Sequence, residues 1–368
     1  MSNTSRLAHR QTLASRFLAV PTAAALMFAG CDYRPEDSEE SPGSMGQVSL
    51  AALDPTVPIA SDLNAGSQNE LGELSGLAAS PNYPGFIWMH RDGYAADPAS
   101  REFLYVMKVV NRELVPFTSS TGTYPTRKFS FAADLVIKNI NWEDIAVGLD
   151  VRDGAGTSIY IGDIGNNNGG RAVYQIYQFA QPNPTGTSST INALQATWKF
   201  SYPLSAKLSN GDYPNCETMF LLDGMLYIIT KESDPRIYRF PTGFASSPGA
   251  THTLVQVTNG ATTTVVGPVG NPSFASFTPD GTRFMIGTHK YFWVYTLPTN
   301  SYNGDALVKA MLLTPTNNYD WTRAIGDLIT YPNLNSEGGT FEVGTRNIII
   351  ATESKMVYHW PQVSYEAP

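Results

Sequence analysis

The strongest constraint on the fold is a series of short strand-like runs between about residues 70 and 362. Runs rich in Val, Ile, Tyr, Phe and Trp, such as 86–90 and 225–230, alternate with turn residues. β-Branched and aromatic residues favour strands, and Asp-Gly pairs such as Asp280-Gly281 are typical of tight turns. Long stretches with helical periodicity are hard to find. The sequence therefore predicts an all-β domain over residues 70–362.

Five segments of this region share one layout: an anchor residue, a short apolar strand, a turn and a second apolar strand. The anchors are Glu73, Glu143, Glu217, Ser273 and Glu337. They lie 56 to 74 residues apart, which is longer than a minimal propeller blade of roughly 40–50 residues but fits blades with long loops. A β-sandwich is the rival fold, but it would not predict repeated anchors, so the pattern favours a β-propeller with five blades. A sixth, degenerate blade within 95–135 or 180–212 is the alternative.

The first thirty residues have the pattern of a secretory signal peptide. Three arginines and no acidic residue accompany an apolar run at 17–30 that is too short for a comfortable membrane span. The run ends at Cys31, and residues 28–31 resemble the lipobox of bacterial lipoproteins, with Phe28 where Leu is usual. We therefore predict a lipoprotein signal peptide over 1–30 and a lipid on Cys31. An ordinary signal peptide that ends beside a cysteine is the alternative.

The segment after Cys31 is rich in acidic residues, Ser, Pro and Gly. Such a composition has little to bury, so we expect residues 31–69 to form a flexible acidic tether. No other stretch reaches the roughly 18 apolar residues that a membrane span needs. The predicted location is therefore the cell envelope, lipid-anchored on the exported side of a bacterial membrane, with the inner or outer membrane left open.

Charge and cysteine content narrow the partners. The chain has 24 basic and 32 acidic residues and a formal net charge of −8, a balance that repels nucleic acid. The expected partners are instead the membrane, through the lipid, and an unknown envelope protein or glycan. Cys31 and Cys216 are the two cysteines, so a lipid on Cys31 leaves Cys216 without a disulfide partner. We expect Cys216 to be a buried packing residue and not a nucleophile.

Several short motifs resemble those of a largely uncharacterised group of exported bacterial propeller proteins, often described as TolB-like or WD-repeat-like. The motifs are Glu73-Leu-Ser-Gly76, Trp88-Met-His-Arg-Asp92, Trp142-Glu-Asp-Ile-Ala146, Tyr160-Ile-Gly-Asp-Ile-Gly-Asn166, Tyr227-Ile-Ile-Thr-Lys231, Thr278-Pro-Asp-Gly281 and Ser336-Glu-Gly338. The chain has Arg91, Asn167 and Thr288 where the group tends to have Asn, Asp and Arg. The resemblance implies a propeller lipoprotein, and it implies little about activity.

The acidic anchors are the candidate site. If each opens the innermost strand of its blade, the carboxylates of Glu73, Glu143, Glu217 and Glu337 converge at one mouth of the central channel. Carboxylates this close repel one another unless they are protonated or bridged by a cation, and Ca²⁺ is the natural oxygen-liganded ion. Residues near the anchors that could add oxygen ligands are Asp144, Asp163 and Asn166. The preferred interpretation is structural: each acid hydrogen-bonds backbone N–H groups of the next blade.

Other catalytic patterns are missing. The loop at 163–170 is rich in Gly and Asn but fails the EF-hand pattern, so a tight turn is favoured over a cation site. Neither a nucleophile elbow nor a paired His or Cys motif for zinc occurs. His90 with Asp92 is a minor acid–base candidate, while His252, His289 and His359 are interpreted as strand-end residues.

Two functions follow from this pattern. The preferred one is a non-catalytic, membrane-tethered binding or scaffolding module for a protein, peptide or glycan. The alternative is a Ca²⁺-dependent hydrolase of phosphoesters or lactones that uses the ring of glutamates. Whether the chain is an enzyme is left open, with a non-enzyme favoured and no catalytic residue assigned.

Overall fold

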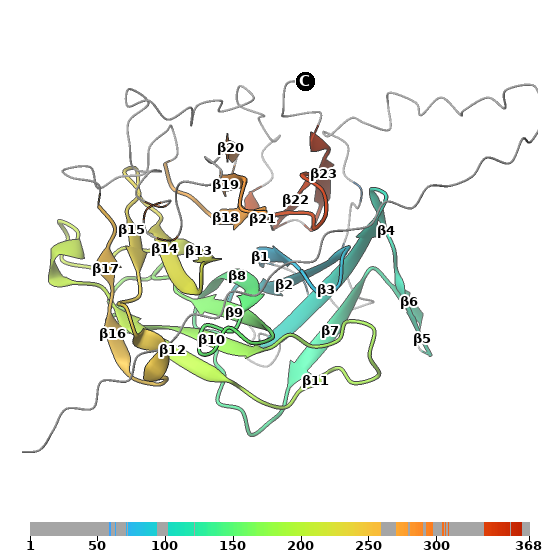
Figure 1. Cartoon of the computed structure of the whole chain (residues 1–368), viewed down its shortest axis with the longest axis horizontal. Helices are drawn as coiled ribbons and strands as arrows, with labels where there is room; N and C mark the ends of the chain where they lie inside the picture. The colour runs from blue at the N-terminus through green and yellow to red at the C-terminus, as the bar shows by residue number, and fades with distance from the viewer. Residues whose placement is uncertain are drawn as a thin grey trace, which may run out of the picture. The chain divides into compact units, whose positions relative to one another are not determined.

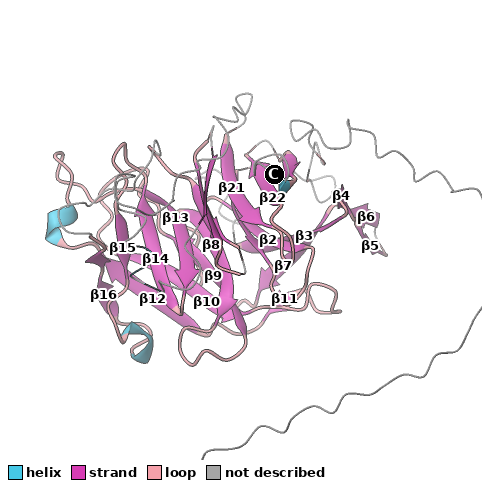
Figure 2. Cartoon of the chain, turned by 45° about the horizontal axis from the view of Figure 1, so that its top comes forward, coloured by secondary structure: helices cyan, strands magenta, loops and turns pink. Residues whose placement is uncertain are grey.

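The computed structural model describes residues 59, 63, 71, 73–93, 102–120, 122–258, 270–278, 280–289, 292–296, 304, 306, 308, 335–353 and 355–362. All of them belong to one compact unit, residues 49–368. They form five small sheets arranged as a five-bladed β-propeller, with almost no helix (Figures 1 and 2). The all-β fold and the five blades are therefore confirmed. The predicted signal peptide, Cys31 and most of the predicted tether lie outside the described residues.

Each blade starts with its innermost strand and continues outward through antiparallel neighbours, except that the outermost strands β11 and β16 of the first two blades are parallel to theirs. The first has β1 (Leu74–Ala79), β2 (Phe86–Arg91), β3 (Phe103–Val110), β7 (Thr126–Phe131) and β11 (Thr190–Ile191), with β4 (Glu113–Leu114) beside β3 and a separate hairpin of β5 (Phe117–Ser119) and β6 (Gly122–Tyr124). The second has β8 (Trp142–Leu149), β9 (Thr157–Asp163), β10 (Tyr174–Ala180), β12 (Ala196–Ser201) and β16 (Thr251–Thr253). The third has β13 (Cys216–Leu222), β14 (Met225–Thr230), β15 (Ile237–Arg239) and β17 (Val255–Gln256).

The last two blades have three described strands each. The fourth has β18 (Phe274–Phe277), β19 (Arg283–Gly287) and β20 (Phe292–Thr296), and the fifth has β21 (Ser336–Phe341), β22 (Ile348–Thr352) and β23 (Val357–Trp360). Two 3₁₀ turns, η3 (Leu204–Ala206) and η4 (Phe244–Ser246), lie in connecting segments of the second and third blades.

The regions that were the alternative for a sixth blade belong to existing sheets. Residues 103–131 supply β3 to β7 of the first blade and its hairpin, and the segment after β10 supplies β11 and β12. β11 lies in the chain between two strands of the second blade, yet it pairs in parallel with β7 of the first blade. β16 likewise lies between two strands of the third blade and pairs in parallel with β12 of the second blade. Each added strand covers an edge that would otherwise expose unpaired backbone groups. Between Glu73 and Glu143 the extra length lies in β4 and the β5–β6 hairpin, and between Glu143 and Glu217 it lies in the connection that contains β11.

The innermost strands form a closed ring. Contacts run from β1 to β8, β13, β18 and β21, and from β21 back to β1. Side chains tie neighbouring inner strands together: the Ser75 hydroxyl donates to the carbonyl of Glu143 at 2.6 Å, and the Asp144 carboxyl accepts from the N–H of Met219 at 2.7 Å. Ser273 and Thr340 make corresponding bonds between the fourth and fifth blades and between the fifth and first.

The core lies between the faces of adjacent blades. Trp88, Trp142 and Trp198 are fully buried there. Upstream of β1, the N–H of Ile59 donates to the carbonyl of Val357 in β23 at 2.8 Å, and Leu63 is fully buried. Residues before β1 therefore help to join the last blade to the first. Within the described residues, no helix combines the length and hydrophobicity that crossing a bilayer requires.

Candidate functional site

The ring of inner strands has two differently lined ends. Residues at the start of β1, β8, β13 and β21 line a cavity of about 260 Å³, which we call the acidic mouth. Residues from the second half of all five inner strands line a cavity of about 560 Å³, which we call the apolar mouth. The acidic mouth is lined by eight charged or titratable residues: Glu73, Asp92, Glu143, Glu217, Lys231, His289, Glu337 and Glu353. The four glutamates proposed from the sequence therefore line one cavity.

A shared backbone irregularity positions three of these glutamates. In β8, β13 and β21 the pairing register skips one residue, and the skipped residues are Glu143, Glu217 and Glu337. A bulged residue leaves the regular ladder, and its side chain is re-aimed. In all three strands the bulge is adjacent to the acidic cavity, so the carboxylates point out of the blade core although they are almost fully buried.

Glu73 reaches the same cavity by a different route. In β1 the skipped residue is Gly76, which has no side chain to offer and a φ of 69°. A Cβ at this position would lie 2.9 Å from the backbone N of Ile145, so only glycine fits against β8 without a shift. Glu73 precedes β1, has a φ of 59° and is exposed. The anchor alignment from the sequence thus placed Glu73 in the correct cavity, although it does not occupy the bulge.

Five further polar residues line the mouth, and of these the sequence had suggested Asp92 alone, as an acid–base partner of His90 at a channel mouth. Asp92, Asn167, Lys231, His289 and Glu353 all follow the second strand of their blades. In an antiparallel hairpin, the end of the second strand lies beside the beginning of the first. A polar residue shortly after each second strand was therefore the available signal. His289 in particular is a site residue, and its interpretation as an isolated strand-end histidine missed this role.

Lys231 and His289 lie between two of the carboxylates. The Lys231 ammonium forms an ion pair with Oε2 of Glu217, and His289 Nε2 lies 2.8 Å from Oε1 of Glu337 and 3.8 Å from Oε2 of Glu217. Lys231 Nζ is 3.2 Å from His289 Nε2. Two cations of the chain itself therefore partly neutralise Glu217 and Glu337.

Glu143 is held by amides instead. Its Oε1 accepts hydrogen bonds from the side-chain amides of Asn141 and Asn167, the latter at 3.3 Å. Asn167 is held in turn by the amide of Asn215, which also donates to Glu217 at 3.2 Å. Both bonds to Glu143 go to one oxygen, and no described residue donates a hydrogen bond to its Oε2. This oxygen of Glu143 is thus available to a ligand in the cavity.

Burial and mutual repulsion change the protonation of the acidic mouth. Burial, together with the charges of Glu217, Glu337 and Glu73, raises the pKa of Asp92 to about 7. Burial also raises the pKa of Glu143 well above its usual value, and nearby carboxylates add to the effect. The pKa of His289 rises to about 9 because the nearby carboxylates of Glu217 and Glu337 favour its charged form. The repulsion expected from the sequence is therefore relieved by bound protons and by the chain's own cations.

The three weaker ligand candidates do not line the acidic mouth. Asp144 is almost completely buried and accepts the backbone N–H groups of Met219 and Ile145, which is the blade-bracing role expected for the glutamates. Asp163 is fully buried and pairs with Arg171 at 2.9 Å. Asn166 is hydrogen-bonded within its loop and to the backbone of residue 213. These oxygens already have structural partners.

The structure also shows the loop at 163–170, His90 and Cys216, which the sequence had singled out. The loop at 163–170 is a turn in which Gly169 and Gly170, and not the asparagines, take positive φ. His90 is fully buried against Trp142, its pKa falls to about 4 because of burial, and it does not line the mouth. Cys216 is fully buried, and burial raises the pKa of its thiol well above the usual value, as befits a packing residue.

A metal ion would find one compact ligand set here. Glu217, His289 and Glu337 each offer an atom within 4.8 Å of the other two. Ca²⁺ takes six to eight oxygen ligands, and Lys231 already occupies Oε2 of Glu217. A metal at this position would have to displace the ammonium of Lys231. The arrangement can hold a cation, but it competes with a resident one.

Neither the protein-family models nor the curated protein sequences match this chain. The fold and the site define a class by themselves: a five-bladed β-propeller with an acidic channel mouth. In this chain, bulged glutamates from three inner strands face a lysine and a histidine that follow the second strands of the third and fourth blades.

Proposed function

We propose that the propeller is a binding module whose acidic mouth takes a small group carrying a positive charge, such as the ammonium or guanidinium of a peptide side chain. One observation carries the proposal: six carboxyl groups and only two basic groups line a cavity of about 260 Å³. This volume lies just below the roughly 300–1,000 Å³ of pockets for drug-sized ligands, so it suits a single side chain or a small amine.

The electrostatics of the mouth support this choice of ligand. Burial raises the pKa values of Asp92 and Glu143, and the negative charge of neighbouring carboxylates raises them further. A bound cation would favour their ionised forms, so binding should release protons and strengthen as Asp92 ionises. The cation affinity should therefore increase as the pH rises through about 7.

Calorimetric titration with Nα-acetyl-lysinamide tests the proposal, with Nα-acetyl-glutaminamide as the uncharged control. We expect the lysine derivative to bind more tightly at pH 8 than at pH 6 and to release protons. Asp92→Asn should remove most of this pH dependence. Asp134→Asn, at an exposed position away from the mouth, should leave it unchanged. Equal affinity for the two derivatives would reject the proposal.

Metal-dependent hydrolysis is the second candidate, because Glu217, His289 and Glu337 can reach a common ion. Lys231→Met removes the competing ammonium, so it should strengthen binding of Ca²⁺, Mn²⁺ or Zn²⁺ if the ligand set is real. Elemental analysis and metal titration of both proteins give the measurement. Failure of each ion to bind the variant would end this candidate, whereas tight binding would justify assays on phosphoesters and lactones.

Export and anchoring are a separate proposal that rests on residues 1–31. We propose that the chain is a lipoprotein of a bacterial envelope, in which the lipid on Cys31 holds the propeller near its partner. Metabolic labelling with a fatty acid in a bacterial host tests this directly. Label and membrane association should both be lost in Cys31→Ala. A Cys216→Ala control should keep them, and label that persisted in Cys31→Ala would refute the anchor.

A further inference from the structure

The apolar mouth, at the other end of the ring, is a second cavity with its own chemistry. It is formed by all five inner strands and has a volume of about 560 Å³, which lies within the range of small-molecule pockets. None of the charged residues of the acidic mouth lines it. It is therefore a separate cavity whose ligand, if any, need not resemble that of the acidic mouth.

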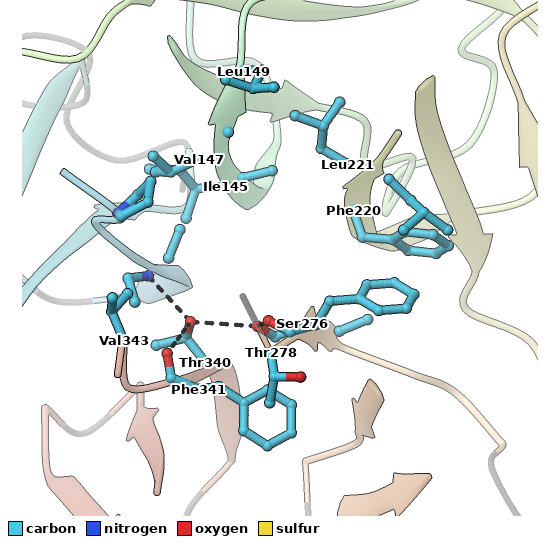
Figure 3. Close-up of a pocket in the computed structure, with 18 of the residues that line it drawn as sticks. Ile145, Val147, Leu149, Phe220, Leu221, Ser276, Thr278, Thr340, Phe341 and Val343 are labelled. Carbon is cyan, nitrogen blue, oxygen red and sulfur yellow. Dashed lines mark hydrogen bonds between the residues drawn. The ribbon is translucent and has the colours of Figure 1, made fainter. Parts of the chain in front are cut away.

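The two sides of this cavity differ in polarity. The second and third blades contribute aliphatic and aromatic side chains, including Ile145, Val147, Leu149 and Leu221 (Figure 3). Leu149 is 58% exposed, which is unusual for a leucine whose strand is otherwise largely buried. With the partly exposed Val147 and Leu221, it forms a continuous apolar surface of the kind that a bound ligand covers.

The opposite side carries hydroxyl groups from the fourth and fifth blades. Ser276 Oγ and Thr340 Oγ1 lie 3.4 Å apart, and the hydroxyl of Thr340 also accepts the N–H of Ala79 at 3.1 Å (Figure 3). Thr278 is committed to Asp280 and to the backbone of Arg283. An aliphatic chain on one side and a few fixed hydroxyls on the other are typical of a pocket for an amphiphilic molecule.

The charged residues at the edge of the apolar mouth favour one kind of amphiphile headgroup over another. None of the described residues that line the apolar mouth is Lys, Arg or His, whereas Asp223 and Asp280 lie at its exposed edge. Asp280 has Arg346 at 3.7 Å, and Asp223 accepts the N–H of Gly304. Asp280 stays ionised because hydrogen bonds from Thr278 and Thr282 outweigh its burial and lower its pKa to about 2. The rim therefore disfavours an anionic headgroup.

We propose that the apolar mouth is a second binding site, for a small amphiphile with an aliphatic chain and a cationic headgroup. The chain would lie against Ile145, Val147 and Leu221, with the headgroup toward Asp223 and Asp280. This site does not depend on the function proposed for the acidic mouth. The two sites require different ligand parts, because the acidic mouth needs only a charge and the apolar mouth needs a chain.

Ligand-observed NMR and calorimetry of the intact chain with octylammonium test the proposal. Octanoate reports the effect of headgroup charge, and ethylammonium keeps the charge without the chain. We expect octylammonium to bind roughly tenfold more tightly than octanoate, because its cationic headgroup would lie beside Asp223 and Asp280. It should exceed ethylammonium by a larger factor, because each added methylene buried in an apolar site strengthens binding. Octanoate binding as tightly as octylammonium would overturn the proposal, and so would equal binding of ethylammonium and octylammonium.

Two leucine variants test whether octylammonium binds in the apolar mouth. Leu149→Lys places a charge in the apolar wall, and Leu204→Lys makes the same change at a leucine that is 79% exposed and outside the cavity. Both positions are exposed, so neither change should prevent folding. Octylammonium affinity should fall roughly tenfold in Leu149→Lys alone. Equal affinities of the two variants would overturn the site. Asp92→Asn should leave the preference for octylammonium over ethylammonium intact, which separates this test from that of the acidic mouth.

Discussion

At the scale of single residues, the two mouths of the ring hold the same kind of carboxyl group in different protonation states. Asp92 has a pKa near 7, whereas Asp280 at the opposite end of the ring has one near 2. The difference has a local cause: Asp92 is partly buried among other carboxylates, whereas Asp280 is exposed and accepts hydrogen bonds from Thr278 and Thr282. His289 shows the reverse effect of the same field, because the carboxylates favour its charged form.

Asp92→Asn should stabilise the protein at alkaline pH. The ordinary pKa of Asp92 is 3.8 and the folded value is about 7, so the folded state binds a proton that the unfolded state lacks between these values. The stability from this proton is complete below about pH 4 and is lost as the pH rises through about 7. At pH 8 the ionised carboxylate of Asp92 destabilises the folded state, so the substitution should raise the free energy of unfolding by about 1–3 kcal/mol. Urea unfolding from pH 4 to 8 measures this, with Asp134→Asn as the unchanged control.

His289→Gln should weaken the pH dependence of stability in a more alkaline range. The pKa of His289 rises from 6.5 to about 9 on folding, so its charge stabilises the folded state fully below about pH 6.5. That contribution disappears as the pH rises through about 9. The wild type should therefore lose stability between pH 6.5 and 9 more steeply than the variant. Thermal unfolding across this range, beside His252→Gln, is the measurement, and parallel curves would show that His289 is not stabilised by Glu217 and Glu337.

At the scale of the strands, β-bulges and side-chain hydrogen bonds between inner strands shape the site. The bulges in β8, β13 and β21 turn a glutamate toward the axis, and side chains such as Asp144 bind the next inner strand. Inner strands of neighbouring blades do not pair in the ladders of the five sheets. Side-chain bonds therefore satisfy backbone groups that the ladders leave open.

Asp144→Ala should destabilise the junction of the second and third blades. The change leaves the buried N–H of Met219 without its acceptor, and an unsatisfied buried donor costs about 1–3 kcal/mol. Asp134→Ala, at an exposed position, should cost far less. Chemical unfolding followed by tryptophan fluorescence compares the two. A loss no larger in Asp144→Ala than in the control would mean that the bond does not brace the blades.

At the scale of the whole molecule, the fold depends on closure between the last and first blades. β21 contacts β1, the Thr340 hydroxyl accepts from the N–H of Ala79, and Ile59 bonds β23. Gly338 allows this approach. A Cβ there would lie 2.9 Å from the backbone N of Leu77 and 3.0 Å from the backbone carbon of Gly76. The ring closure holds β1 and β21 in place, so the backbone atoms of Leu77 and Gly76 have little freedom to move away.

Gly338→Ala should therefore lower the melting temperature more than Gly148→Ala. At Gly148 a new Cβ would come within 2.5 Å of the tip of the Leu221 side chain, which can rotate away. We expect a cost of about 1–3 kcal/mol for Gly338→Ala, the usual range for overpacking, and less for the control. Calorimetry measures both. Equal shifts would indicate that the closure tolerates a wider spacing between β21 and β1.

The glutamates show how far the site could be predicted from the chain. Glu143, Glu217 and Glu337 were recognisable because each begins an apolar strand that is followed by a turn and a partner strand. The bulge itself was not visible, so Glu73 was aligned with them although Gly76 occupies the bulge in β1. Register depends on which residues pair across a hairpin, and the apolar pattern alone leaves an uncertainty of a few residues.

The amino-acid sequence by itself determined the local properties of this protein: strands from β-branched and aromatic runs, turns from Asp-Gly pairs, and one acid at the start of most inner strands. Tertiary structure decided which groups meet. Lys231 and His289 are 58 residues apart, yet both reach Glu217 because two hairpins from adjacent blades end at the same mouth. Periodicity can be recognised in the sequence, whereas this convergence, and with it the pKa shifts of Asp92, Glu143 and His289, arises only once the ring has closed.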